Sequence, residues 1–267
     1  TEDNMYFLKK AGFVASEGKR VTLSKESKEL LRLWSRGQTE AVRKAILKRV
    51  LCSPYRAYMQ FLLHLERTGG TVTIPCGGGK GARSSALRSM LERVGFETDV
   101  ASFFTMRDFF YDFELVNTAT DSTKQSETIF LTSRISPVPL IAKERFERCI
   151  KIDGHYLYYD RRVLHEEFCK GLISAYKILS DRWGKWVSLI QLREAVTVEL
   201  RISDDSFNSL LVKAIENKIC GNFKVKASAG YRVGPLRYGT RVKAMKVPRM
   251  SSGTLIQYVA VEKGDKQ

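Results

Sequence analysis

The chain has 267 residues, of which 43% are hydrophobic, and a formal net charge of +16. This hydrophobic content is sufficient for packed cores and excludes a disordered chain, and the length predicts two or three small domains. Lysine and arginine outnumber aspartate and glutamate by 14 to 7 in residues 1–70 and by 13 to 5 in residues 201–267, so the two ends carry most of the excess charge. A basic balance of this size favours a polyanionic partner, and nucleic acid is the first candidate.

The sequence predicts neither a membrane span nor a secretory signal. Its longest apolar runs are far shorter than the about 20 residues of a membrane helix, and the N-terminus lacks a charged-then-apolar pattern. The five cysteines are scattered without a C-x-x-C pair, which argues against a zinc ribbon and a dense disulfide framework. We therefore expect reduced cysteines and an intracellular protein, either cytoplasmic and nucleoid-associated or nuclear. Because the chain begins with Thr1, we expect a trimmed chain or a piece of a longer polypeptide.

Residues 1–36 predict the end of a helix, a β-hairpin and a further helix. A glycine stop at Gly12 is followed by two short strands around a turn at Ser16–Gly18. Ser24 is a suitable N-cap for a helix through Trp34, which we expect to link this part to the next domain.

Residues 37–136 predict a middle domain. The expected elements are helices over 39–51, 54–66, 82–94 and 102–113 and strands over 71–74, 113–117 and 128–132. The helix over 82–94 follows a glycine loop, and its apolar Leu87, Met90, Leu91 and Val94 recur at helical spacing. We expect it to be the third helix of this domain. Ser133–Leu140, which contains two prolines, predicts the linker that ends the domain.

Residues 143–267 predict a C-terminal domain. The expected elements are helices over 161–179, 189–200 and 203–218 and strands over 186–188, 223–227 and 254–261. Ser203 or Asp204 is the expected N-cap of the third helix. The apolar stripe that should bury this helix comprises Phe207, Leu210, Leu211, Ala214 and Ile215.

Two short segments of the chain are similar to each other in sequence, and both are similar to a motif of a known family. Leu8–Phe13 and Leu91–Phe96 both close a helix with a leucine, two polar residues, a small apolar residue, glycine and phenylalanine. Such an ending before a hairpin resembles the winged-helix branch of the helix-turn-helix proteins. The element order over about residues 160–262 is similar to a whole domain of that family. The resemblance implies a mainly α protein with small β-hairpins, an α+β fold, built from tandem winged-helix domains.

Residues 222–249 contain eight cations and no acidic residue, interleaved with Tyr231 and Tyr238. Uncompensated cations on one segment repel one another unless an anion is near. We therefore expect this segment to be a basic wing that contacts nucleic acid. Asp204 and Asp205, by contrast, oppose the approach of a phosphate to the start of the third helix, so the wing is the stronger candidate.

The helix over 82–94 has a cationic face opposite its apolar stripe. Arginine and serine on the first turns of such a helix can contact phosphates and base edges. The predicted DNA-binding residues of the whole chain are therefore Lys80, Arg83, Ser84, Arg88, Lys224, Lys226, Arg232, Arg237, Tyr238, Arg241, Lys243, Lys246 and Arg249.

Three enzyme-like patterns are weak. Gly77–Gly81 lacks the spacing of a Walker A loop, and His165 with Glu166 and Glu167 lacks the second histidine of a metalloprotease helix. The carboxylates that could hold Mg²⁺ do not stand in the acid-x-Lys arrangement of common nucleases; they are Asp112, Glu114, Asp153 and Asp160. We expect no catalytic residue, no metal and no cofactor in this chain.

The sequence therefore favours sequence-specific binding of double-stranded DNA, as in a transcriptional regulator or a replication or segregation factor. One alternative is the DNA-recognition portion of a larger enzyme, such as a restriction endonuclease. A weaker alternative is RNA binding, in which Tyr231 and Tyr238 would stack on unpaired bases. The expected partners are DNA and either further domains or a second copy of the chain, and no membrane.

Overall fold

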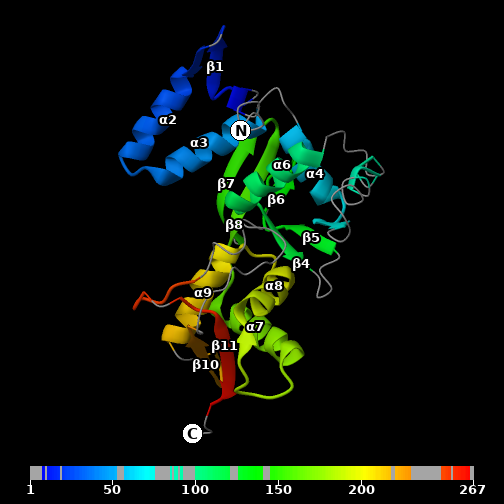
Figure 1. Ribbon diagram of the computed structural model, residues 1–267, viewed down its shortest axis with the longest axis vertical. Helices are drawn as coiled ribbons and strands as arrows, with labels where there is room; N and C mark the ends of the chain where they lie inside the picture. The colour runs from blue at the N-terminus through cyan, green and yellow to red at the C-terminus, as the bar shows by residue number, and fades with distance from the viewer. Residues whose placement is uncertain are drawn as a thin grey trace.

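The protein is described by a computed structural model that covers residues 8–9, 11–18, 20–52, 57–75, 85, 87–89, 91–92, 100–120, 126–140, 145–217, 220–229, 248–253 and 255–264. Over these residues, helices pack against four small antiparallel sheets (Figure 1). The predicted α+β class is confirmed. Within the same ranges, no helix is long and apolar enough to cross a lipid bilayer.

The N-terminal residues form a hairpin followed by a helix, as predicted. β1 (Val14–Glu17) pairs with β2 (Arg20–Leu23), and α2 (Lys25–Ser35) follows. Gly12 has a φ of +72°, a left-handed conformation that suits glycine at this turn. Ser24 caps α2 by accepting a hydrogen bond from the Ser27 N–H at 3.2 Å.

Three helices and a three-stranded sheet follow. The elements are α3 (Thr39–Leu51), α4 (Ala57–Arg67), β3 (Thr71–Pro75), α6 (Val100–Asp112), β4 (Val116–Thr120) and β5 (Ser126–Leu131). The strands lie in the order β3–β5–β4. Phe61 of α4 packs against Phe103 and Phe110 of α6, with ring centroids 5.4 and 5.6 Å apart. These rings are buried and form the centre of the first core.

A second three-stranded sheet continues this core, and the sequence did not predict it. Its strands are β6 (Arg134–Ser136), β7 (Phe146–Ile152) and β8 (His155–Arg161), in the order β6–β8–β7. β6 occupies part of the segment predicted to be a linker, because Ile135 and Ser136 pair with β8 and are buried. The linker prediction over Ser133–Leu140 is therefore wrong for its first half.

The C-terminal residues form a separate unit with the predicted element order. Its elements are α7 (His165–Leu179), β9 (Val187–Ser188), α8 (Leu189–Leu200), α9 (Asp204–Glu216), β10 (Phe223–Ser228) and β11 (Tyr258–Lys263). Ser203 caps α9 by accepting a hydrogen bond from the Ser206 N–H at 3.0 Å, as expected. The largest differences from the predicted bounds are at two starts: α7 begins at His165 because residue 161 belongs to β8, and the last strand begins at Tyr258.

The buried apolar residues group into two cores. The first extends from Ala11 to Tyr159 and the second from Val163 to Val261. The predicted divisions near residues 36 and 140 do not coincide with this arrangement. The N-terminal hairpin and β6–β8 both contribute to the first core, so the chain passes between cores just after β8. Figure 1 shows the first core above and the C-terminal unit below.

The segment from α4 to β5 in the first core and the C-terminal unit from α7 to β11 share one topology. Each contains, in chain order, a helix, a strand, helical residues, a second helix and two strands that form a hairpin. In each of these two sheets, the third strand along the chain lies between the first and the second. α6 stands directly before its hairpin, as α9 does. The sequence had assigned this position to the helix over 82–94, whose described residues 85, 87–89 and 91–92 are helical but precede α6.

Leu211→Ala should lower the free energy of unfolding of the C-terminal unit by about 2–5 kcal/mol, because the side chain is fully buried under α9 and its removal leaves a cavity. Chemical denaturation followed by circular dichroism measures the change. Leu31→Ala removes the same atoms from a side chain that is 55% exposed and should change the stability little. Equal effects of the two substitutions would show that the packing of α9 is wrong.

Candidate nucleic-acid interface

The described part of the predicted basic wing is its base. Lys224 and Lys226 alternate with buried Val225 on β10, so both lysines lie on the exposed face of the strand. The Lys226 Nζ lies 2.7 Å from Glu262 on the neighbouring β11. Arg249 is exposed beside its bridge partner Leu255. The other predicted wing residues lie outside the described residues: Arg232, Arg237, Tyr238, Arg241, Lys243 and Lys246.

The predicted reading helix is described only in part. Leu87 and Leu91 are buried and Arg88 is exposed, as predicted for these three positions, while Met90 and Val94 lie outside the described residues. Lys80, Arg83 and Ser84 lie outside the described residues. Arg88 is thus the one member of this predicted set that the structure places, and it is accessible.

α6 occupies the position before the middle hairpin but offers no accessible cation. Its one basic residue is Arg107, which is buried and paired with Glu127 of β5 at 3.0 Å. A second carboxylate, Asp108, lies 2.6 Å from the same guanidinium. These carboxylates neutralise Arg107, so α6 is poorly suited to bind a phosphate.

The start of α9 is covered by the first core. Asp204 is 1% exposed and accepts hydrogen bonds from the Tyr111 hydroxyl at 2.7 Å and the Asn117 amide at 2.8 Å. Arg193 of α8 lies 3.4 Å from the same carboxylate. The Ser203 hydroxyl also donates to Glu114 at 2.8 Å. We call these contacts the Asp204 clasp; they cover the N-terminus of α9.

Tyr111 and Asn117 each act as hydrogen-bond donors to the carboxylate in the Asp204 clasp. Burial raises the pKa of the Tyr111 hydroxyl, and the neighbouring negative charge of Asp204 raises it further, so the hydroxyl stays a donor. The second amide contact of Asn117 goes to the carbonyl of Ile202 at 3.0 Å, and its side-chain oxygen accepts from the Thr118 N–H. The buried carboxylate is therefore fully surrounded by donors, which is what its burial requires.

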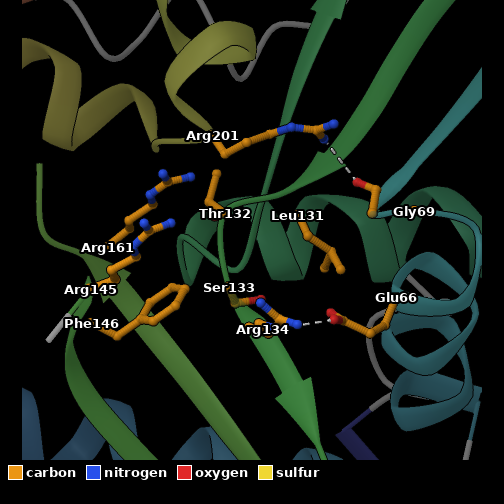
Figure 2. Close-up of a pocket in the computed structure, with 11 residues that line it drawn as sticks. Glu66, Gly69, Leu131, Thr132, Ser133, Arg134, Arg145, Phe146, Arg161 and Arg201 are labelled. Carbon is orange, nitrogen blue, oxygen red and sulfur yellow. Dashed lines mark hydrogen bonds and ion pairs between the residues drawn. The ribbon is translucent and has the colours of Figure 1, made fainter. Parts of the chain in front are cut away.

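A pocket of about 340 Å³ opens at the junction of the two cores, and its wall is strongly basic. Four arginines and one glutamate line it: Arg134, Arg145, Arg161, Arg201 and Glu66. They come from β6, the two ends of the β7–β8 hairpin, the C-cap of α8 and the end of α4. Figure 2 shows Arg145 and Arg161 side by side on one wall and the Arg134–Glu66 pair on the other.

The charges in this pocket are only partly balanced. Arg134 lies 3.5 Å from Glu66, and Arg161 lies 4.0 Å from Glu167. Among the described residues, no carboxylate forms an ion pair with Arg145. Burial lowers the pKa of the Arg161 guanidinium, and the nearby charges of Arg145 and Arg201 lower it further, against the opposing effect of Glu167. Arginine stays protonated all the same, so three like charges are held together, and an anion would relieve their repulsion.

Backbone geometry directs Arg201 into the pocket. This residue ends α8 in a left-handed conformation with a φ of +54°. Its guanidinium donates to the carbonyl of Gly70 at 3.2 Å and lies 5.7 Å from the centre of the Phe130 ring. One donor group of the guanidinium is thus used for positioning, and the side chain lines the cavity.

The sequence did not indicate this pocket. Successive arginines of the pocket are separated by 11, 16 and 40 residues along the chain, mostly in a region where the charge is nearly balanced. The hairpin that carries Arg145 and Arg161 had a usable signal, since Asp153-Gly154 between two apolar runs is typical of a tight hairpin turn. That signal would have placed both arginines at one end of a sheet.

The enzyme-like carboxylates do not form a cluster. Glu114 pairs with Arg43 at 3.2 Å and Asp160 with Arg148 at 3.3 Å, while Asp153 lies in the β7–β8 turn. Among the described residues, the one group of three potential metal ligands is a different set, His165, Cys169 and Cys220. Cys169 and Cys220 form a disulfide across 51 residues, so the expectation of reduced cysteines is wrong for this pair.

No protein-family model, curated protein or solved structure matches this chain. The assignment of a function therefore depends on the geometry and charge described above.

Tyr111→Phe should destabilise the protein by about 1.5–3 kcal/mol, because it removes a hydrogen bond to a buried carboxylate and leaves the ring in place. Denaturant unfolding is the measurement. Tyr258→Phe, at a tyrosine that is 43% exposed, is the matched control and should have little effect. If Tyr111→Phe is as harmless as the control, the Asp204 clasp does not join the two cores.

Proposed function

We propose that this protein binds double-stranded DNA without catalysis, and that it does so chiefly through contacts to phosphates. The observation that carries the proposal is the arginine pocket, which Arg145, Arg161 and Arg201 line with incomplete charge balance. Planar guanidinium groups recognise phosphate oxygens by paired hydrogen bonds. A pocket of this kind at the surface suits one phosphate of a backbone.

The C-terminal unit supports DNA as the source of that phosphate. Its order α7–β9–α8–α9–β10–β11, with the sheet order β10–β11–β9, is the order that resembles the winged-helix proteins. The segment between β10 and β11 is basic, and exposed Lys224 and Lys226 lie on β10 just before it. We infer that a duplex follows this wing and the arginine pocket, so that cations from both parts of the chain neutralise its backbone.

The mode of binding differs from the insertion of α9 into the major groove. The Asp204 clasp covers the start of that helix, and its described exposed residues include a single cation, Lys213. A recognition helix normally meets base edges with its N-terminal residues. Any preference for a DNA sequence would therefore come from Arg88, together with Arg83 and Ser84. The C-terminal unit would supply affinity for the DNA backbone.

Arg145→Gln combined with Arg161→Gln should weaken binding to every duplex and flatten the dependence of log K on log salt by about 0.9, since the pocket holds one phosphate and each lost phosphate contact removes about 0.9 from the slope. Fluorescence anisotropy with a labelled duplex, measured between about 50 and 200 mM salt, gives the slope. Arg32→Gln removes a charge from an exposed arginine of α2 and should leave the slope unchanged.

Two further measurements separate the pocket from the wing. Replacing Arg237, Arg241, Lys243 and Lys246 together with glutamine should flatten the slope independently of the pocket variant, by several units. A slope that is unchanged in the pocket variant would remove the pocket from the interface. If neither variant binds more weakly than the wild type, the protein is not a DNA-binding protein of this kind.

A further inference from the structure

A histidine and two cysteines lie together at one end of the C-terminal unit. His165 begins α7 and Cys169 follows four residues later on the same face of the helix. The His165 Nε2 is 3.5 Å from the Cys169 Sγ. Cys220 comes from the segment between α9 and β10, and the three potential ligand atoms all lie within 4.8 Å of one another.

The backbone holds Cys220 in place independently of the disulfide. Its N–H donates to the Phe223 carbonyl at 3.0 Å, and the Phe223 N–H donates back to the Cys220 carbonyl at 3.2 Å. Cys169 is fixed by the helix and packs in the second core. Breaking the sulfur–sulfur bond would thus leave both side chains close together.

The three residues differ in their exposure to solvent. Both cysteines are buried, at 5% and 0% exposure, whereas His165 is exposed. An ion could therefore reach the sulfur atoms from the side of the imidazole. The surrounding second core would shield the sulfur atoms on the other side.

One imidazole and two thiolates are a ligand set that favours Zn²⁺ over oxygen-preferring ions such as Mg²⁺ and Ca²⁺. The fourth position of a tetrahedral zinc ion would be taken by water. Zinc–sulfur bonds of about 2.3 Å place two tetrahedral sulfur ligands about 3.8 Å apart. The disulfide must therefore be reduced before the metal binds.

We propose that the reduced protein binds one Zn²⁺ ion through His165, Cys169 and Cys220, and that the disulfide is the oxidised, metal-free form of the same site. Two molecules of a small thiol reduce the disulfide, giving two cysteine thiols and one disulfide of the small thiol. Zinc then binds and the two cysteine thiols release two protons. In both forms α7 is joined to the segment that leads into β10 and the basic wing.

Cobalt substitution tests this site in the full chain. The protein is reduced with a phosphine, freed of metal and reductant without air, and titrated with Co²⁺. The wild type should bind one ion per chain and show the thiolate-to-cobalt absorption and visible bands of a tetrahedral site, and Zn²⁺ should displace them. The oxidised protein should show none of these bands.

Variants assign the ligands. His165→Ala keeps both thiols and removes an exposed side chain, so it should fold and yet bind Co²⁺ at least about tenfold more weakly, the loss that even an outer-shell change can cause. Cys220→Ser should lose most of the thiolate absorption, while Cys149→Ser, at a cysteine outside the site, should match the wild type. A reduced wild type without the absorption, or a His165→Ala protein with unchanged affinity, would overturn the proposal.

Discussion

The buried carboxylate of Asp204 is the contact on which the arrangement of this protein depends. A carboxylate removed from water is costly unless donors surround it, and here a tyrosine, an asparagine and an arginine do so from three different elements. Its position in the first turn of α9 adds the favourable interaction with the helix dipole. Because two of these donors belong to the first core, the carboxylate can be satisfied in one relative placement of the two cores.

That placement has two opposite consequences for a nucleic acid. It covers the start of α9, the part that a recognition helix would need for base contacts. It also brings Arg201, at the end of α8, opposite the β7–β8 hairpin with Arg145 and Arg161. In the proposed mode of binding, the same interface covers the groove-reading end of α9 and forms the basic pocket that would bind a phosphate. This exchange is the physical basis for proposing backbone contacts as the main source of affinity.

Local features of the sequence were predictable where one segment decides its own structure. The helices over 39–51 and 189–200 have the predicted bounds. The caps Ser24 and Ser203 are confirmed because each hydroxyl accepts a hydrogen bond from an N–H three residues later, a contact that is local in sequence. Leu87 and Leu91 are buried as predicted.

Features that depend on distant segments were not predictable in this way. The proline-containing segment after residue 132 resembles a linker until β8 pairs with it. Asp204 resembles an ordinary helix-dipole residue until Tyr111 and Asn117 reach it across 93 and 87 residues. The arginine pocket and the Cys169–Cys220 pair likewise join segments that carry no common motif.

The most direct test of this account is the binding of a DNA duplex by Asp204→Ala, a variant that keeps every arginine. Circular dichroism would first establish that both cores remain folded. If the Asp204 clasp assembles the pocket, the variant should lose the share of the salt dependence that belongs to the pocket, about 0.9 in the slope for one phosphate contact. A variant that is folded, lacks the clasp and retains the wild-type slope would contradict the account.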